Sequence, residues 1–279
     1  MNPRQKKLSA PKILAYCFAM GWALMTLYPL LVTVLSSVKS NEEIFGRMFA
    51  LPKAWHLEFY YESFVKARMS RYILNSLFLA TSTTTLVAVI GSMAAYVLAR
   101  TSFKFVKPIY LLFLVGVMIP LHSTIIPIAR IVGAIKGMDN YLVLILVYAT
   151  FQLPQAIFLI AGFMKGIDRE IEEAATIDGC TLVGTLFKIM LPISTSIIFT
   201  ASILAFISVY SELIFSVILL SSPDLYPVSR GLMYFTGDHT QRMGPIFASL
   251  IMAALPMVCV YIFAHEHIQR GMLAGAVKG

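Results

Sequence analysis

The chain has 279 residues, of which 58% are hydrophobic and 13% are charged, and its formal net charge is +8. An ordinary soluble domain carries about 25% charged residues, so this composition and the mean hydropathy of +0.80 exclude a water-soluble fold. The basic residues lie in short loops between apolar runs, as topology signals do in membrane proteins, and this argues against nucleic-acid binding. We therefore expect an all-α integral membrane protein.

Six apolar runs are each long enough to cross a bilayer, because a spanning helix needs roughly 20 mostly apolar residues. The first follows a basic N-terminal tail and is too long for the apolar region of a signal peptide. We therefore expect residues 1–12 to form a cytoplasmic tail and residues 13–38 the first transmembrane helix. The other five runs lie within residues 72–265, at 72–99, 106–131, 141–164, 193–220 and 244–265.

The connections between these runs indicate the orientation of the chain. More Lys and Arg residues fall on one set of loops than on the other, and cytoplasmic loops carry this excess. The richer set comprises residues 1–12, 100–107, 165–192 and 266–279, so we expect both termini in the cytoplasm. Residues 39–71 then lie outside the cell, and their mixture of charged and aromatic residues fits either short amphipathic helices or a solvated loop.

The cytoplasmic segment 165–192 contains the most informative stretch. Asp168 is suited to an N-cap, the glutamates that follow it complement the positive end of a helix dipole, and Gly179 is suited to a left-handed helix end. The i, i+3, i+4 rule places four residues on one face, namely Ile171, Ala174, Ala175 and Leu182. A short helix with small residues and acids fits a groove on a partner protein, and its tethers to two spans allow mechanical coupling.

The spacing of this stretch resembles a known motif. Glu173-Ala174-Ala175, then Gly179, then Ile189 and Leu191-Pro192 resembles the EAA loop of the permease subunits of ABC importers. Further matches place the chain near the carbohydrate branch, which includes the smaller maltose permease protein. These are Asn75-Ser76, Ala95-Tyr96, Ala99-Arg100, Met118-Ile119-Pro120 and the end of the chain from Gly275 to Gly279.

This resemblance implies a type I ABC importer permease fold with six transmembrane helices, in which residues 72–265 form the five-helix core and residues 165–192 the coupling loop. It implies a bacterial cell-membrane assembly that imports a sugar, such as an oligosaccharide or glycoside, through two permease subunits, a heterodimer here. Two ATPase subunits and an extracellular solute-binding protein complete the assembly. The implied ATPase-coupling residues are Ile171, Glu172, Glu173, Ala174, Ala175, Asp178, Gly179 and Leu182.

The chain itself is not expected to be an enzyme. It contains no phosphate loop of the GxxxxGK[ST] type, so ATP and Mg²⁺ are expected on the partner ATPase, and no cofactor or metal is expected on this chain. His265 and His267 flank Glu266 at the end of the last span, but a metal site needs more ligands than these. An interfacial cluster is the better interpretation of these three residues.

Several polar residues fall inside the apolar runs. Glu212 lies deep in the fifth run, where a charge is costly and faces water or the bundle interior. It therefore either lines the translocation path or serves as a structural partner to a polar group. Weaker path candidates are Tyr210, Ser211, Gln152, Tyr148 and His122. The family often has Trp-Asn where Tyr210-Ser211 precede Glu212, so substrate specificity is not carried over.

Two other classes of function are weighed against the permease. A secondary transporter driven by an ion gradient also uses interrupted helices and acids near the midplane, and Glu212 is the residue that favours it. A membrane-embedded enzyme requires a convergent set of nucleophile, base or metal ligands, which the sequence does not display. Uptake by the purified chain with an ion gradient and no ATPase distinguishes the first alternative from an ABC permease.

Overall fold

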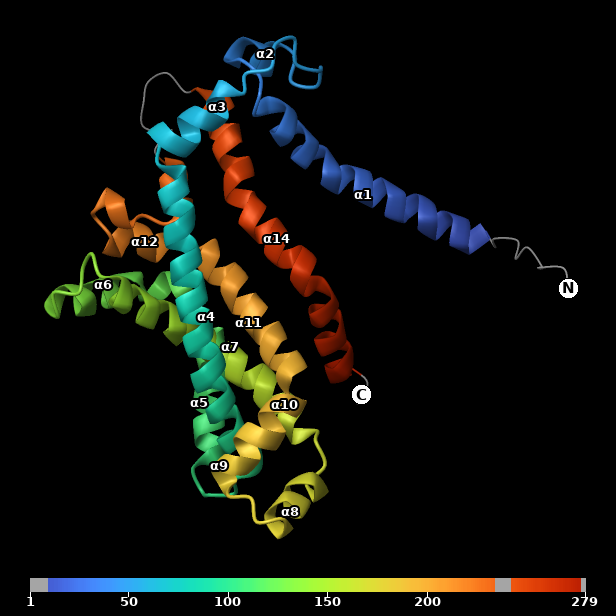
Figure 1. Ribbon diagram of the computed structural model, residues 1–279, viewed down its shortest axis with the longest axis vertical. Coiled ribbons are helices and arrows are strands. Elements are labelled where there is room, and N and C mark those ends of the chain that lie inside the picture. The colour runs from blue at the N-terminus through green and yellow to red at the C-terminus, as the bar shows by residue number, and fades with distance from the viewer. Residues whose placement is uncertain (1–9, 234–241, 277–279) are drawn as a thin grey trace, which may run out of the picture. The chain divides into compact units, whose positions relative to one another are not determined.

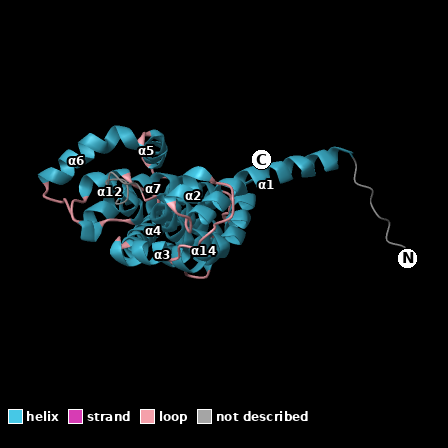
Figure 2. Cartoon of the chain, turned by 90° about the horizontal axis from the view of Figure 1, so that it is seen from above, coloured by secondary structure: helices cyan, strands magenta, loops and turns pink. Residues whose placement is uncertain are grey.

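The computed structural model describes residues 10–233 and 242–276, with side chains described as far as residue 265. Within this part all regular secondary structure is helical (Figures 1 and 2). The chain forms two compact units, of which one comprises residues 1–67 and 234–254, and the other residues 68–233 and 255–279. The predicted all-α architecture is confirmed.

The first unit begins with α1 (Ala10–Ser36), an apolar helix that contains Pro29. Its side chains from residue 11 to residue 31 are all exposed, so in a membrane they contact lipid or another chain. The segment after α1 contains short helices, as one of the two interpretations predicted: α2 (Asn41–Gly46), α3 (Glu58–Tyr61) and the π-helix η1 (Glu62–Lys66).

A buried lysine organises the turn after α2. Lys39 is only 1% exposed, and its ammonium donates hydrogen bonds to the carbonyl groups of Met48 (2.9 Å) and Ala50. Ser37 and Tyr60 share a hydrogen bond of 2.7 Å between their hydroxyl groups. These contacts fix the backbone of the segment 39–66 locally, because a buried ammonium must have acceptors.

The second unit is built on three long helices, α4 (Met69–Arg100), α7 (Tyr141–Lys165) and α11 (Thr195–Tyr210). They pack side by side (Figure 1) around a core that includes Ala95, Ala156 and Ala161. Small residues at such contacts let helix backbones approach closely. The shorter elements here are α5 (Val106–Met118), η2 (Leu121–Thr124), α6 (Ile125–Ala134), α8 (Glu170–Ile177), α9 (Leu182–Thr185), η3 (Leu186–Met190), α10 (Leu191–Ile193), α12 (Ile214–Leu219), η4 (Pro223–Leu225) and α13 (Val228–Gly231).

Two of the predicted runs are not straight helices. The run 106–131 bends by 97° between α5 and the η2–α6 pair, because Pro120 supplies no backbone N–H and holds Ile119 in an extended conformation. The run 193–220 is interrupted at residues 211–213, between α11 and α12. A further bend of 75° separates the stretch Leu182–Ile193 from α11.

The count of transmembrane segments agrees with the sequence prediction. Four helices are long and apolar enough to cross a membrane, and the two bent pairs bring the number to six when each pair is one span. The last helix, α14 (Met243–Ala276), is longer than the predicted run 244–265. Residues 266–276 of the predicted C-terminal tail are therefore helical, while residues 1–9 and 277–279 of the two predicted tails lie outside the described part.

Candidate coupling and transport sites

The predicted coupling segment forms a short helix at one end of the second unit. In Figure 1, α8 lies beyond the C-terminal ends of α4 and α7. The helix starts at Glu170, after Arg169, whose carbonyl accepts hydrogen bonds from the backbone N–H groups of Glu172 (2.9 Å) and Glu173 (3.0 Å). The expected N-cap at Asp168 is wrong, because helical geometry begins two residues later and no side chain caps this end.

The end of α8 has the geometry that Gly179 predicts. Its φ of +80° lies in the left-handed region, which glycine adopts without strain. The N–H of Cys180 donates to the carbonyl of Ala175 (2.9 Å) and that of Asp178 to Ala174 (3.0 Å), so the last carbonyl groups are satisfied. The chain then turns directly into α9, whose Gly184 N–H is capped by the Thr181 hydroxyl at 3.1 Å.

The residues of the predicted coupling set divide between two faces of the segment. Ala175 is buried (4% exposed) and the Glu172 side chain is only 18% exposed. The other six are exposed: Ile171, Glu173, Ala174, Asp178, Gly179 and Leu182. Two further apolar side chains, Ile177 (86% exposed) and Val183, belong to the same exposed surface. The i, i+3, i+4 rule did not predict these two residues.

The inward carboxylate of Glu172 reaches the end of α4. Its Oε1 lies 2.5 Å from Nε of Arg100, and its Oε2 accepts a hydrogen bond of 3.1 Å from the Tyr96 hydroxyl. A second guanidinium nitrogen of Arg100 donates to the carbonyl of Ile167 (2.8 Å) in the α7–α8 connection. Tyr96 and Arg100 enter the sequence prediction only through the matched pairs Ala95-Tyr96 and Ala99-Arg100 and the basic loop 100–107. Their i, i+4 spacing at a helix end indicates a shared face.

A second polar cluster connects α7 with the end of α11. The Tyr148 hydroxyl donates to Oε2 of Glu212 (2.7 Å), and Nε2 of Gln152 donates to the Ser208 hydroxyl (3.0 Å). Tyr148 and Gln152 are four residues apart along the chain, and so are Ser208 and Glu212. The two hydrogen bonds between the helices therefore lie one helical turn apart. The exposed Ser211 lies one turn beyond Ser208, at the start of the break.

Glu212 also determines the backbone path at this break. Its Oε1 accepts a hydrogen bond of 2.9 Å from the N–H of Phe215 at the start of α12, and its carbonyl accepts one of 2.6 Å from the Ser229 hydroxyl. The structure thus brings three of the predicted path residues together, Glu212, Tyr148 and Gln152. Tyr210 is buried with its ring against Phe206, and His122 lies exposed in η2.

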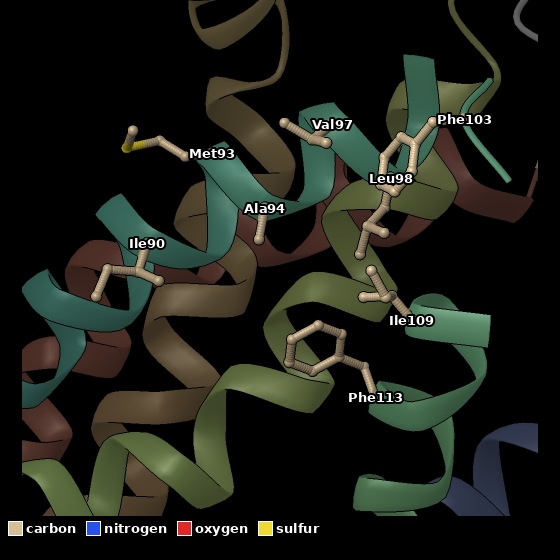
Figure 3. A pocket seen from close by; sticks show the side chains of 8 residues that line it. All are labelled: Ile90, Met93, Ala94, Val97, Leu98, Phe103, Ile109 and Phe113. Carbon is tan, nitrogen blue, oxygen red and sulfur yellow. The ribbon is translucent and has the colours of Figure 1, made fainter. Parts of the chain in front are cut away.

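An apolar groove lies between α4 and α5 (Figure 3). It is lined by Ile90, Met93, Ala94, Val97, Leu98, Phe103, Ile109 and Phe113. These side chains offer no hydrogen bond to a hydroxyl-rich solute, whereas the α7–α11 cluster offers an amide, hydroxyls and a carboxylate. The groove is therefore suited to an apolar neighbour, and the polar cluster is the better candidate for contact with a polar solute.

The described residues contain no group of three or more His, Cys, Asp or Glu side chains that could hold a metal ion. Nδ1 of His265 lies 2.8 Å from the carbonyl oxygen of Ile262, and its ring lies against Tyr261. The side chains of Glu266 and His267, which the sequence analysis grouped with His265, lie outside the described residues. The interfacial cluster of the three residues stays a prediction.

Residues 87–273 match the model of a protein family described as the binding-protein-dependent transport system inner membrane component. The chain belongs to this family. It is a permease subunit of an ABC importer, an all-α membrane protein of the type I fold that works with a separate ATPase and is not itself an enzyme. The alternatives of an ion-gradient transporter and a membrane enzyme are thereby set aside.

Curated relatives are similar over most of the permease. A probable ABC transporter permease protein of Bacillus subtilis, YurM, is 32% identical over 90% of this chain and 84% of its own. The sulfoquinovosyl glycerol transport system permease protein SmoH of Agrobacterium fabrum is 30% identical over 91% and 89%. The diacetylchitobiose uptake system permease protein NgcG of Streptomyces coelicolor is 28% identical over 92% and 86%.

Solved structures share the fold of the permease. One is the crystal structure of a bacterial ABC transporter that imports the acidic polysaccharide alginate, with a TM-score of 0.82 at 19% identity over 94% of this chain and 99% of the other. A second is a bacterial alginate ABC transporter in complex with an alginate pentasaccharide-bound periplasmic protein, with a TM-score of 0.67 at 16% identity. At these identities the likeness shows the fold alone.

Proposed function

We propose that this permease imports a sugar, either an oligosaccharide or a related glycoside, into a bacterial cell. Its relatives SmoH and NgcG are named for a sulfoquinovosyl glycerol system and a diacetylchitobiose system, and the chain covers most of each. We propose that it pairs with a different permease subunit, two ATPase subunits and an extracellular solute-binding protein. The observation that carries the coupling part of this proposal is the exposed surface of α8 at one end of the second unit.

The orientation that we propose puts α8 in the cytoplasm. Arg100, Lys104, Lys107 and Lys165 all lie near the helix ends on the α8 side of the second unit, and an excess of basic residues is typical of cytoplasmic loops. Both termini are then cytoplasmic and residues 39–71 extracellular. This orientation presents α8 to the compartment that contains ATP.

Coupling is assigned to the two faces of the α8 segment. The exposed set Ile171, Glu173, Ala174, Asp178, Gly179 and Leu182, extended by Ile177, contacts the ATPase subunit. Ala174 and Gly179 permit close approach of the partner surface, and the Glu173 carboxylate is available to a basic residue on it. Glu172 and Ala175 face inward and hold the segment on the bundle.

The translocation path is assigned to the α7–α11 polar cluster. The Gln152 amide and the hydroxyls of Ser208 and Ser211 are accessible groups that can exchange hydrogen bonds with sugar hydroxyls. Glu212 and Tyr148 hold the break between α11 and α12 in position, and Tyr210 supports it from the buried side. His122 stays a weaker candidate on η2.

The coupling assignment is tested by Glu173→Lys, which reverses the charge at an exposed position of α8. We expect copurification of the ATPase subunit and ATP-driven sugar uptake in proteoliposomes to fall by about tenfold or more, with membrane insertion unchanged. The matched control is Glu42→Lys, which makes the same charge reversal on the exposed side of α2. Wild-type copurification and uptake by the Glu173→Lys variant would refute the assignment.

The path assignment is tested by Gln152→Ala, which removes the accessible amide without touching α8. We expect the KM for sugar uptake to rise several-fold while ATPase association is unchanged, since each lost hydrogen bond is worth about 1 kcal/mol. Ser202→Ala is the control, because the Ser202 hydroxyl bonds the Ile198 carbonyl of its own helix. An unchanged KM in the Gln152→Ala variant would count against this path.

A further inference from the structure

The coupling helix is joined to the transmembrane bundle by a shielded ion pair. The side chain of Arg100 is only 6% exposed and that of Glu172 only 18%. An ion pair shielded from water is harder to separate than a surface pair, because either charge left alone would be poorly solvated. A contact of this kind resists separation of the two elements, because the opposite charges attract each other.

Three elements meet at Arg100. The residue itself ends α4, its guanidinium contacts Glu172 of α8 (2.5 Å), and it donates to the Ile167 carbonyl between α7 and α8 (2.8 Å). The Tyr96 hydroxyl, one turn earlier on α4, donates to the second oxygen of Glu172 (3.1 Å). Arg100 therefore joins the end of α4 both to α8 and to the connection between α7 and α8.

Behind this contact α4 and α7 form a closely packed pair. Ala95 and Tyr96 of α4 share a buried cluster with Ile160, Ala161 and Met164 of α7, and each of the five is at most 2% exposed. Packed interiors of this kind resist compression and transmit displacement. A force applied to Glu172 thus acts on the α4–α7 pair as one body.

The other side chains of α8 hold the helix less firmly to the bundle. Ala175 is buried, but Ile171 is 40% exposed and Ile177 86%. An alanine methyl in contact with a neighbour can slide, because dispersion forces carry little directional preference. Among the described side chains of α8, Glu172 is therefore the one that ties the helix to α4 by a charge contact and a hydrogen bond.

We propose that Arg100, Glu172 and Tyr96 form a latch through which displacement of α8 moves α4 and α7. This inference rests on the proposed role of α8 as the ATPase-coupling helix and adds the route by which its movement reaches the bundle. Arg100, Glu172 and Tyr96 are positioning residues that touch neither nucleotide nor solute. Opening the latch leaves the ATPase bound and hydrolysing ATP but uncouples hydrolysis from transport.

The test compares Arg100→Gln, Glu172→Gln and the charge exchange Arg100→Glu/Glu172→Arg in the full complex in proteoliposomes. Three quantities are measured: ATPase copurification, the rate of ATP hydrolysis and the number of sugar molecules moved per ATP. We expect both single variants to retain copurification and to lose about tenfold in sugar per ATP, and the exchange to recover part of that loss. Lys104→Gln, an exposed basic residue of the same loop, is the matched control and should behave as wild type.

A milder variant keeps the test decisive if a charge substitution prevents folding. Tyr96→Phe removes only the hydroxyl that contacts Glu172, and we expect a smaller loss of sugar per ATP with normal assembly. Unchanged sugar per ATP in Tyr96→Phe and in every folded charge variant would overturn the latch, as would loss of ATPase copurification in step with transport. Failure of the coupling assignment itself is recognised separately, because Glu173→Lys would then assemble and transport normally.

Discussion

At the residue scale, Gly179 controls how α8 ends. Its φ of +80° costs an ordinary L-residue about 1–2 kcal/mol. The space around it is open, since no atom of the described residues other than Gly179 and its two chain neighbours lies within 4 Å of the position that an added methyl group would take. Steric clash therefore adds nothing to the conformational cost, and the local stability of the α8 end depends on this single backbone conformation.

Gly179→Ala should therefore loosen the end of α8 by about 1–2 kcal/mol. We expect the amides of Asp178 and Cys180, which close this end, to exchange roughly tenfold faster with deuterium. Gly179→Asn should have a smaller effect because asparagine tolerates the left-handed region. Gly162→Ala, in the last turn of α7 with open space around it, is the control. Equal acceleration of amide exchange near the substituted residue in the two alanine variants would contradict this account.

Asp139 is a residue outside the membrane spans whose pKa is shifted by hydrogen bonds from the backbone. The backbone N–H groups of Ser222 (2.9 Å) and Ser221 (2.5 Å) donate to its Oδ1, and these hydrogen bonds lower the pKa of the carboxyl below its usual range. Because the folded pKa is the lower one, the carboxylate stabilises the fold above the unfolded pKa and loses this effect as the pH falls through the folded pKa.

Asp139→Asn should lower the melting temperature at about pH 7, and the difference from wild type should shrink as the pH is reduced below about 4. Thermal unfolding of the detergent-purified permease measures this. Ser222→Pro removes one of the two backbone donors at a residue whose φ of −75° already suits proline, and it should reduce the same pH dependence. A melting difference that is constant with pH would contradict the assignment.

At the element scale, α12 is held at both ends by side chains from outside it. Glu212 accepts from the first turn, and Arg230 donates to the carbonyl groups of Ser216 (2.6 Å), Val217 (2.9 Å) and Leu220 at the C-terminal end. The Arg230 guanidinium also stacks on the Tyr226 ring at 3.8 Å. A six-residue helix has little stability of its own, so these contacts determine whether it persists.

Arg230→Gln should destabilise the permease by about 1–3 kcal/mol, because carbonyl groups that accept from a charged donor lose their partner. Arg230→Lys should destabilise the permease less than Arg230→Gln, since the lysine ammonium retains part of the hydrogen bonding of the guanidinium. Arg130→Gln, at an exposed position of α6, should stay within about 0.5 kcal/mol of wild type. Unfolding curves in detergent measure the free energy of unfolding of each variant. An equal loss of stability in Arg230→Gln and Arg130→Gln would show that the hydrogen bonds from Arg230 do not stabilise α12.

The elements also show where sequence reasoning succeeds and where it ends. The α8 helix, its acidic start and its end at Gly179 are local features, so nearest-neighbour rules predict them. The bend at Pro120 has a visible cause in proline chemistry, although the run around it was assigned as one span. The break before α12 has no proline, and it forms because Glu212 and Ser229 meet through the folded chain.

At the scale of the whole molecule, composition indicated a membrane protein and the apolar runs indicated six spans, because the bilayer selects apolar runs of one length. The contacts that join α8 to the bundle were not predictable in the same way. Tyr96 and Glu172 are 76 positions apart, and they meet only because α4 and α7 pack along their lengths. The motif thus predicts which segment couples, while the packing shows which helices that segment contacts.

The most direct test of the coupling account is the labelling of a cysteine placed at Ile177, which is 86% exposed on α8, after Cys17, Cys180 and Cys259 are replaced by serine. A membrane-impermeant maleimide should label this cysteine in inverted vesicles but not in intact cells, and bound ATPase subunits should protect it. Labelling from outside the cell, or labelling in inverted vesicles that is indifferent to the ATPase, would contradict the role of α8 as the cytoplasmic coupling helix.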